Sequence, residues 1–223
     1  MRYKMSAVVI AAAFLGSSVS VSPVAAAYGW GASWWMNEPA GSTQMVDVSG
    51  NGHTGTLGPG VSALGGIYQF TGQGTVTVPD SPTLDPLVGD FRYEAMVRWT
   101  GGFRDPNFVQ KGEYGTRGGQ WKMDYFHGSG FCKVIGSKRQ LSVRVAFPLH
   151  DGQWHVIICS KRARSISISV DPGTSRARHN VAYGDVGSIY NRRPVSIGGK
   201  EYCPHHRCDF FTGQIAWVIV RPL

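Results

Sequence analysis

Apolar and polar residues alternate in short runs along the chain from about residue 53 onward. In the clearest run, alternate positions hold apolar and aromatic residues: Phe91, Tyr93, Ala95, Val97 and Trp99. The positions between them hold Arg92, Glu94, Met96 and Arg98. Successive side chains of a strand point to opposite faces of a sheet, so this run predicts a strand with one face in the core and the other in water.

The same alternation predicts further strands. Their core-facing residues are expected to be Trp121, Met123 and Tyr125, then Leu141, Val143 and Val145, then Trp154, Val156 and Ile158, then Ile166, Ile168 and Val170, and finally Ile215, Trp217 and Ile219. Turn-forming residues separate the runs, as in Gly50-Asn51-Gly52 and Asp171-Pro172-Gly173. No helical periodicity extends over more than a turn or two. The sequence therefore predicts an all-β, two-sheet antiparallel sandwich.

The first residues have the three parts of a secretory signal peptide. Arg2 and Lys4 precede an apolar run from Ala7 to Leu15, and small residues end in Ala25-Ala26-Ala27. The alternative is a membrane anchor, but the run is shorter than the roughly 20 apolar residues that span a bilayer. We therefore predict a signal peptide over residues 1–27, one secreted domain over residues 28–223, and no transmembrane segment in the mature chain.

The chain contains four cysteines, Cys132, Cys159, Cys203 and Cys208, all in the part predicted to be exported. An oxidising compartment lets disulfides persist, and four thiols allow three connectivities. We predict Cys132–Cys159, which joins two strands, and Cys203–Cys208, which closes a tight loop. The alternative is a metal site, because His205 and His206 lie between the last two cysteines. That segment lacks the second pair of ligands that a zinc module draws from elsewhere in the chain.

Several segments, taken in order, resemble the LamG-like jelly-roll family, whose laminin G domains are grouped with concanavalin A-like lectins and glucanases. They include the loop at 46–57, the segment at 76–85, Asp151-Gly152-Gln153-Trp154-His155-Val156, and Phe211-Thr212-Gly213-Gln214-Ile215. The resemblance implies a two-sheet jelly roll over nearly the whole mature length. In the 151–156 corner we expect Trp154 to be buried and His155 to point to the opposite face.

The resemblance also implies a calcium site in the first loop. Many relatives bind one calcium ion there through the aspartate that matches Asp47 and nearby carbonyls, and Asn51 and His53 lie in the same loop. An acidic residue in the last strand assists them, and this chain has Ala216 at that position. Calcium prefers six to eight oxygen ligands, so the missing carboxylate weakens the site. The alternative is that Asp47 only caps a turn.

Catalytic machinery is not recognisable in the sequence. Retaining glycan hydrolases need two carboxylates flanking the scissile bond, commonly presented two residues apart on one strand, and no two acidic residues here have that spacing. Gln153-Trp154-His155 looks like the Gln-x-His element of jelly-roll lyases, but the accompanying arginine-rich and tyrosine motifs are missing. We therefore predict that the protein is not an enzyme, and a glycan-degrading activity is the least favoured function.

We predict a lectin-like module that binds carbohydrate. Candidate residues are Arg92, Glu94 and Arg98 on the wet face of the 90–99 strand, and the aromatic residues Phe103, Phe126, Tyr190 and Tyr202. The net charge of +8 favours an anionic glycan or cell-surface polymer. Nucleic acid is not expected, because the basic residues are scattered and the densest group, at 161–164, has no interleaved aromatics. The alternative is an extracellular adhesion or structural domain that contacts protein.

Overall fold

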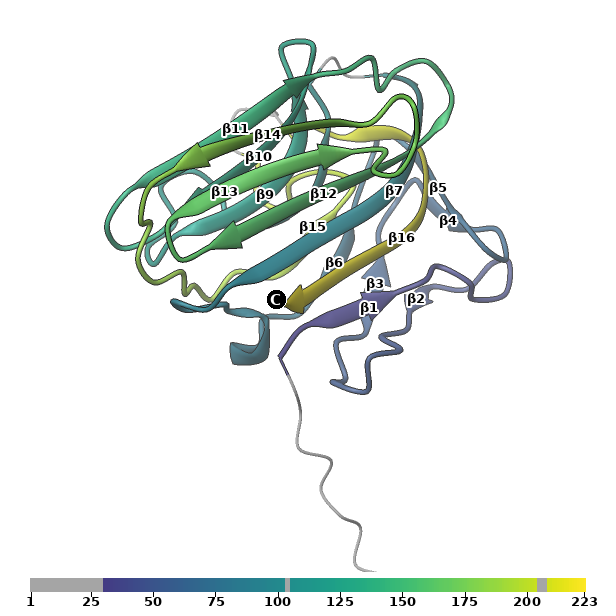
Figure 1. Cartoon of the computed structure of the whole chain (residues 1–223). Helices are drawn as coiled ribbons and strands as arrows, with labels where there is room; N and C mark the ends of the chain where they lie inside the picture. Colours follow the sequence, from purple (N-terminus) through teal and green to yellow (C-terminus); the bar gives the residue numbers. More distant parts are fainter. Residues whose placement is uncertain (1–29, 103–104, 204–207) are drawn as a thin grey trace, which may run out of the picture.

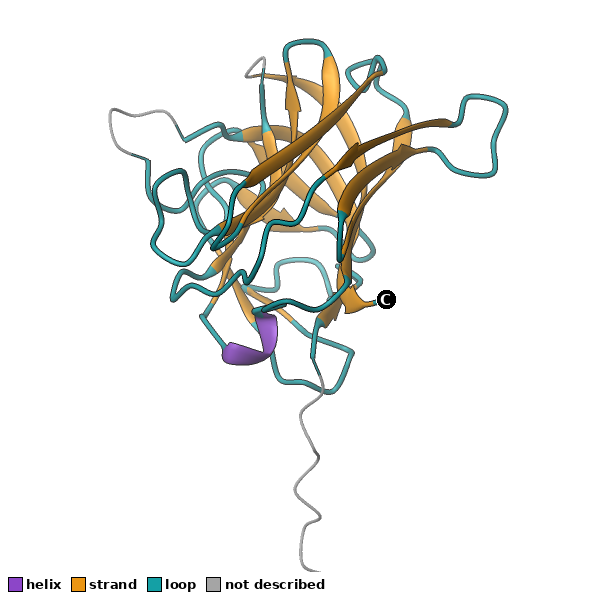
Figure 2. Cartoon of the chain, turned by 60° about the vertical axis from the view of Figure 1, so that its left-hand side comes forward, coloured by secondary structure: helices purple, strands orange, loops and turns teal. Residues whose placement is uncertain are grey.

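The computed structural model describes residues 30–102, 105–203 and 208–223. They form two antiparallel β-sheets that pack face to face (Figures 1 and 2), which confirms the predicted all-β jelly-roll sandwich. One short 3-10 helix, η1 (Pro82–Leu84), lies among these strands. No helix in the described ranges is long and apolar enough to cross a membrane. The predicted signal peptide and Phe103 lie outside the described residues.

Sheet A has eight strands, in the order β14-β13-β12-β7-β16-β5-β4, with β1 also paired to β16. Their bounds are β1 (Ala32–Trp34), β4 (Val61–Ala63), β5 (Tyr68–Thr71), β7 (Phe91–Gly102), β12 (Trp154–Arg162), β13 (Ser165–Val170), β14 (Arg178–Tyr183) and β16 (Phe211–Pro222). Figure 1 shows β12, β7 and β16 lying side by side, and they form the middle of this sheet.

Sheet B also has eight strands, in the order β11-β10-β9-β8-β15-β6-β3-β2. Their bounds are β2 (Gln44–Met45), β3 (Gly55–Leu57), β6 (Val76–Val78), β8 (Asn107–Lys111), β9 (Gln120–Phe126), β10 (Ser129–Ile135), β11 (Gln140–Ala146) and β15 (Val195–Ile197). Strands distant in sequence, such as β6, β15 and β8, are neighbours here, so the sheet forms only when most of the chain is in place.

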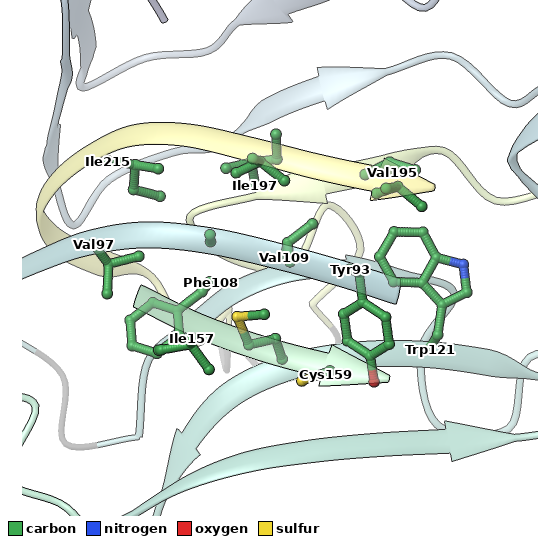
Figure 3. Close-up of a cluster of buried hydrophobic side chains, with 14 of the residues drawn as sticks. Tyr93, Val97, Phe108, Val109, Trp121, Ile157, Cys159, Val195, Ile197 and Ile215 are labelled. Atoms are coloured by element: carbon green, nitrogen blue, oxygen red, sulfur yellow. The ribbon is translucent and has the colours of Figure 1, made fainter. Parts of the chain in front are cut away.

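The hydrophobic core lies between the two sheets. Figure 3 shows side chains of β7, β12 and β16, among them Val97, Ile157 and Ile215, facing Phe108 and Trp121 of sheet B. All of these side chains are completely buried. Each contributes about 1.5–3 kcal/mol through removal of its apolar surface from water. The predicted inward faces of β7, β9 and β13 are confirmed.

Two predicted strand faces are wrong. In β12 the residues that face the core are His155, Ile157 and Cys159, so Trp154, Val156 and Ile158 lie on the outer face. In β16 the pairing with β7 shifts between Ile215 and Trp217, which marks a β-bulge at Ala216. One extra residue reverses the alternation beyond it. The core therefore receives Val218 and Val220, and Trp217 and Ile219 lie outside.

Hydrogen bonds from both ring nitrogens explain why His155 is buried. Its Nδ1 and Nε2 lie 2.8 Å from Asp171 Oδ2 and 2.8 Å from Asp151 Oδ1 respectively. The ring also packs edge-on against Phe147, with centroids 5.1 Å apart. Both nitrogens of the imidazole thus have partners inside the fold, so burying it leaves no polar atom unsatisfied. Its neighbour Trp154 consequently points outward.

Both predicted disulfides are present. Cys132–Cys159 connects β10 of sheet B to β12 of sheet A, with the Cα atoms 5.8 Å apart. Cys203–Cys208 closes a loop between β15 and β16. The described residues contain no free cysteine. Two disulfides in a chain of this size fit an oxidising compartment.

Candidate functional site

The outer face of sheet B has two polar rows. Residues directly opposite one another on adjacent strands share a face. The register places in one row Thr77, Ser196, Gln110, Lys122, Lys133 and Ser142. It places in the next row Asn107, Asp124, Phe131 and Arg144. The two rows bring together residues from six strands.

A groove of about 430 Å³ lies over β9, β10 and β11 on this face. Its lining is Lys122, Phe126, Phe131, Lys133, Gln140, Ser142, Val143 and Arg144. The rings of Phe126 and Phe131 lie 5.5 Å apart, and Phe126 is 39% exposed. Lys122 Nζ lies 5.9 Å from the centroid of the Phe131 ring. The groove therefore combines accessible aromatic faces with three cationic side chains.

Beside the groove, the same face contains polar side chains that are buried. The segment that follows β15 covers them: Asn107 Nδ2 and Ser196 Oγ each donate a hydrogen bond to Gly199 O over 2.9 Å. Gln110 is 1% exposed, yet neither its Oε1 nor its Nε2 has a hydrogen-bond partner among the described residues. The same is true of Asn107 Oδ1 and Asp124 Oδ1. Such atoms normally have a partner, but these are buried and their residues do not line the groove.

The charges on this face influence one another. Burial raises the pKa of the Asp124 carboxyl, while its ion pair with Lys122 acts in the opposite direction. Burial lowers the pKa of Lys133, and the nearby charge of Lys122 lowers it further. Lys133 Nζ also lies 5.4 Å from the ring centroid of the exposed Tyr114. Positive charge exceeds negative charge along the groove.

The structure divides the predicted carbohydrate-binding residues among three places. Of these residues, only Phe126 lies in the groove. Arg92, Glu94 and Arg98 lie on the outer face of sheet A, on the opposite side of the sandwich. Glu94 is buried there rather than wet, because Arg221 Nε donates to its Oε1 over 2.8 Å. The Arg98 guanidinium lies 5.9 Å from the centroid of the Trp154 ring.

Tyr190 and Tyr202 lie at a third place, on the loops at the end of sheet B. Tyr190 lines a cleft with Arg117, Arg192 and Arg193. The guanidinium of Arg193 lies 5.6 Å from the centroid of the Tyr202 ring. Both tyrosines thus lie next to arginines, a grouping that the sequence did not predict.

The loop predicted to bind calcium is held by Asp47. Its Oδ1 accepts hydrogen bonds from the backbone amides of Ser33 and Ser49, and its Oδ2 accepts one from the amide of His53. Burial acts to raise the pKa of Asp47, but these hydrogen bonds outweigh burial and the pKa lies below its ordinary value. Asn51 Nδ2 donates to Gly31 O over 2.8 Å, which fastens the loop to the start of β1.

These contacts show Asp47 acting as the cap of the loop. Asn51 and His53 lie beside it, but their side chains have other partners. Asn51 Nδ2 donates to Gly31 O, and His53 Nε2 forms a hydrogen bond with the Thr83 hydroxyl. The described residues contain no group of three His, Cys, Asp or Glu side chains that could hold a metal ion. A calcium ion here would therefore depend on backbone carbonyls and water for most of its six to eight oxygens. Calcium stays a prediction.

Sequence reasoning did not identify Gln110, Asn107, Asp124 or Phe131 as site residues. Their alternation in β8, β9 and β10 is that of an ordinary wet strand face. Only the pairing of distant strands, and the cover that the segment after β15 provides, distinguishes them from surface residues.

No protein-family model matches the sequence, and no curated protein sequence matches it. Solved structures do match. The binding domain of Paraclostridial Mosquitocidal Protein 1 has a TM-score of 0.64 at 12% identity, over 86% of this chain and 49% of that chain. Domains LG4-5 of the mouse laminin alpha1 chain have a TM-score of 0.52 at 16% identity, over 74% of this chain and 43% of that chain.

A third match is domain 4 of AbnA, a GH43 extracellular arabinanase from Geobacillus stearothermophilus, in complex with arabinotriose. It has a TM-score of 0.56 at 15% identity, over 79% of this chain and 85% of that chain. This chain spans about half the length of the toxin and laminin chains. Identities this low show the fold alone: the protein has the two-sheet jelly roll found in laminin G domains.

Proposed function

We propose that the protein is a secreted, non-catalytic module that binds a glycan chain in the groove on the outer face of sheet B. A sugar ring has an apolar C–H face and a rim of hydroxyl groups. Aromatic rings pack against the C–H face, and polar or charged side chains form hydrogen bonds with the hydroxyl groups. Phe126 and Phe131 supply rings, and Lys122 and Arg144 supply donors beside them.

The pair of aromatic rings at Phe126 and Phe131, beside three cationic side chains in one groove, carries the proposal. Aromatic rings pack against the apolar face of a sugar. Hydroxyl groups both donate and accept, so a sugar can also pair with Lys122, Arg144 and the exposed amide of Gln140. The arabinanase domain that was solved with arabinotriose has the same fold, which supports a glycan as ligand.

The test is retention of the secreted, oxidised protein in gels that contain neutral or acidic polysaccharides, run with calcium and again with chelator. Phe131→Ala should weaken binding about 3- to 10-fold, the value of one aromatic contact. Trp217→Ala on sheet A is the matched control and should leave retention unchanged. Retention on no polysaccharide, or loss with Trp217→Ala alone, contradicts the proposal. Loss with chelator alone would show that binding depends on calcium.

A second candidate function, protein contact in an adhesion or structural role, is favoured by the outer face of sheet A. Val156, Met96 and Trp217 are cross-strand neighbours there, and Ile158 and Ile219 lie beside them, all partly exposed. Trp35 is 46% exposed and its ring lies 6.3 Å from that of Trp217. Contiguous apolar surface of this kind is typical of protein interfaces.

A further inference from the structure

The loops at 115–118 and 190–193 enclose a cleft of about 890 Å³ at the end of sheet B, larger than the groove. Its lining is Gly115, Thr116, Arg117, Gly118, Tyr190, Asn191, Arg192 and Arg193. All three arginines are exposed. Arg193 faces Glu113, with Nε and Oε2 3.5 Å apart, whereas Arg117 and Arg192 form no ion pair with any described residue.

The cleft is built on a buried ionic network rather than on free surface loops. Lys111 is 0% exposed, and its Nζ donates to Asp80, to Asp85 and to the backbone oxygen of Asn191 over 2.7, 2.8 and 2.6 Å. The backbone N–H of Asn191 in turn donates to Asp85 Oδ1 over 3.2 Å. The 190–193 loop is thereby fixed to the interior at the point where its arginines begin.

The two loops are also fixed to each other. Asn191 Nδ2 donates to Gly119 O over 3.0 Å, and the Tyr190 amide donates to Gly118 O over 2.8 Å. Gly118 has φ of +91°, and a Cβ placed on it would lie 1.6 Å from the Tyr190 carbonyl oxygen. Only glycine can occupy position 118 while the two loops lie this close together. The arginines therefore project from a rigid frame, which reduces the entropy lost when they bind.

From this geometry we infer that the cleft is a second binding site, which takes the oxyanion groups of an acidic polysaccharide: phosphate, sulfate or carboxylate. Guanidinium groups bind such oxygens through two parallel hydrogen bonds. Arg117 and Arg192 line the same cleft, so the oxyanion groups of one polymer can contact both. The site lies on different loops from the groove, so the inference stands whether or not the groove binds a glycan.

A polysaccharide fits the cleft better than a nucleic acid does. Binding of single strands relies on bases stacking on open aromatic faces. Here the Tyr202 ring lies under Arg193, and the Tyr190 hydroxyl interacts with Arg192. The loop that forms one wall continues to Tyr114, which contacts Lys133 of the groove. A polymer held in the cleft can therefore extend toward sheet B.

The experiment compares the full secreted protein with the double variant Arg117→Gln/Arg192→Gln. The matched control is Arg164→Gln/Arg178→Gln, which removes the same charge from exposed positions in the β12–β13 turn and at the start of β14. The probes are dextran sulfate, polyphosphate, polygalacturonate, neutral dextran and single-stranded DNA, with inorganic phosphate as competitor. The acidic arms distinguish sulfate, phosphate and carboxylate as the preferred group.

The cleft variant should bind the preferred acidic polymer about tenfold or more weakly, since charged hydrogen bonds are lost. The control variant should stay within about twofold of the parent. Equal weakening of both variants, no weakening of either, or tighter binding of DNA than of every polysaccharide overturns the inference. A groove failure is distinguishable, because Phe131→Ala affects neutral and acidic polysaccharides alike while the cleft variant spares neutral ones. Unchanged thermal unfolding of both double variants excludes misfolding.

Discussion

The two outer faces of the sandwich reverse the usual relation between polarity and exposure. On sheet B, the polar side chains of Asn107, Gln110 and Asp124 are buried. On sheet A, the apolar side chains of Trp217 and Ile219 remain partly exposed. An outer sheet face is therefore not the same as a wet face. Whether a side chain on an outer face is buried depends on which segments of the chain cover that face. Whether the face is polar or apolar depends on the partner it contacts.

The contrast between the two faces also separates two kinds of binding surface. Sheet B has a groove with cations, aromatic rings and polar side chains, which suits a hydroxylated ligand. Sheet A has contiguous apolar side chains flanked by charged groups such as Arg92, Glu94 and Arg98, which suits a protein. Four predictions test this division.

The largest expected effect concerns the buried charges near sheet B. Lys111→Met leaves Asp80 and Asp85 without their cation, and unpaired buried charge costs about 3–5 kcal/mol. The same substitution at Lys138, whose ion pair with Asp185 is exposed, should cost at most about 1 kcal/mol. Urea unfolding of the two variants gives the difference directly. Equal costs would mean that the Lys111 network adds no more stability than an exposed ion pair does.

Much of the fold could be predicted from the sequence, because strand alternation and turn residues are local properties. The inward face of β7 follows from its own residues, and the even number of cysteines in a chain predicted to be exported favoured two disulfides. The faces of β12 and β16 could not be predicted in this way. In β12 the partners of His155 come from residues 151 and 171, and in β16 a single bulged residue, Ala216, reverses the pattern.

The candidate sites were less predictable than the fold, because they are assembled from distant strands and loops. Phe126 was identified by being aromatic and outside the core strands. Gln110 and Phe131 become neighbours of Lys122 and Asp124 only through pairing among β8, β9 and β10. No short-range pattern marks such pairs. Tyr190 was identified, but its arginine partners were not.

The second prediction concerns the unused polar atoms of sheet B. Gln110→Met replaces an amide that has no partner among the described residues, so it should stabilise the fold by roughly 1 kcal/mol. It should leave glycan retention unchanged, because the side chain is buried and does not line the groove. On sheet A, Gln214→Met removes a hydrogen bond from Nε2 to Gln69 Oε1 and should destabilise slightly. Thermal unfolding measures both. A destabilised Gln110→Met variant would assign the amide a structural role.

The third prediction tests the outward orientation of β16 beyond its bulge. Ile219→Thr should change the free energy of unfolding by less than about 1 kcal/mol, since the side chain lies on the outer face. Ile157→Thr, in the core of the same sheet, should cost several times more. Sedimentation velocity on Ile219→Thr and Trp217→Thr then reports whether the apolar face drives association. Equal costs at Ile219 and Ile157 would contradict the assigned bulge.

The smallest expected effect concerns the corner that turns Trp154 outward. Burial acts to raise the pKa of Asp151, but hydrogen bonds from Arg176 and His155 lower it below the ordinary value of 3.8. A depressed folded pKa means that the ionised carboxylate stabilises the fold above about pH 4, and this contribution is lost as pH falls through the folded pKa. Asp151→Asn lacks it at every pH. The stability gap between parent and variant should therefore be constant near neutrality and close in acid. A gap that does not narrow at all as the pH falls below about 4 would show that the side chain holds His155 by shape rather than by charge.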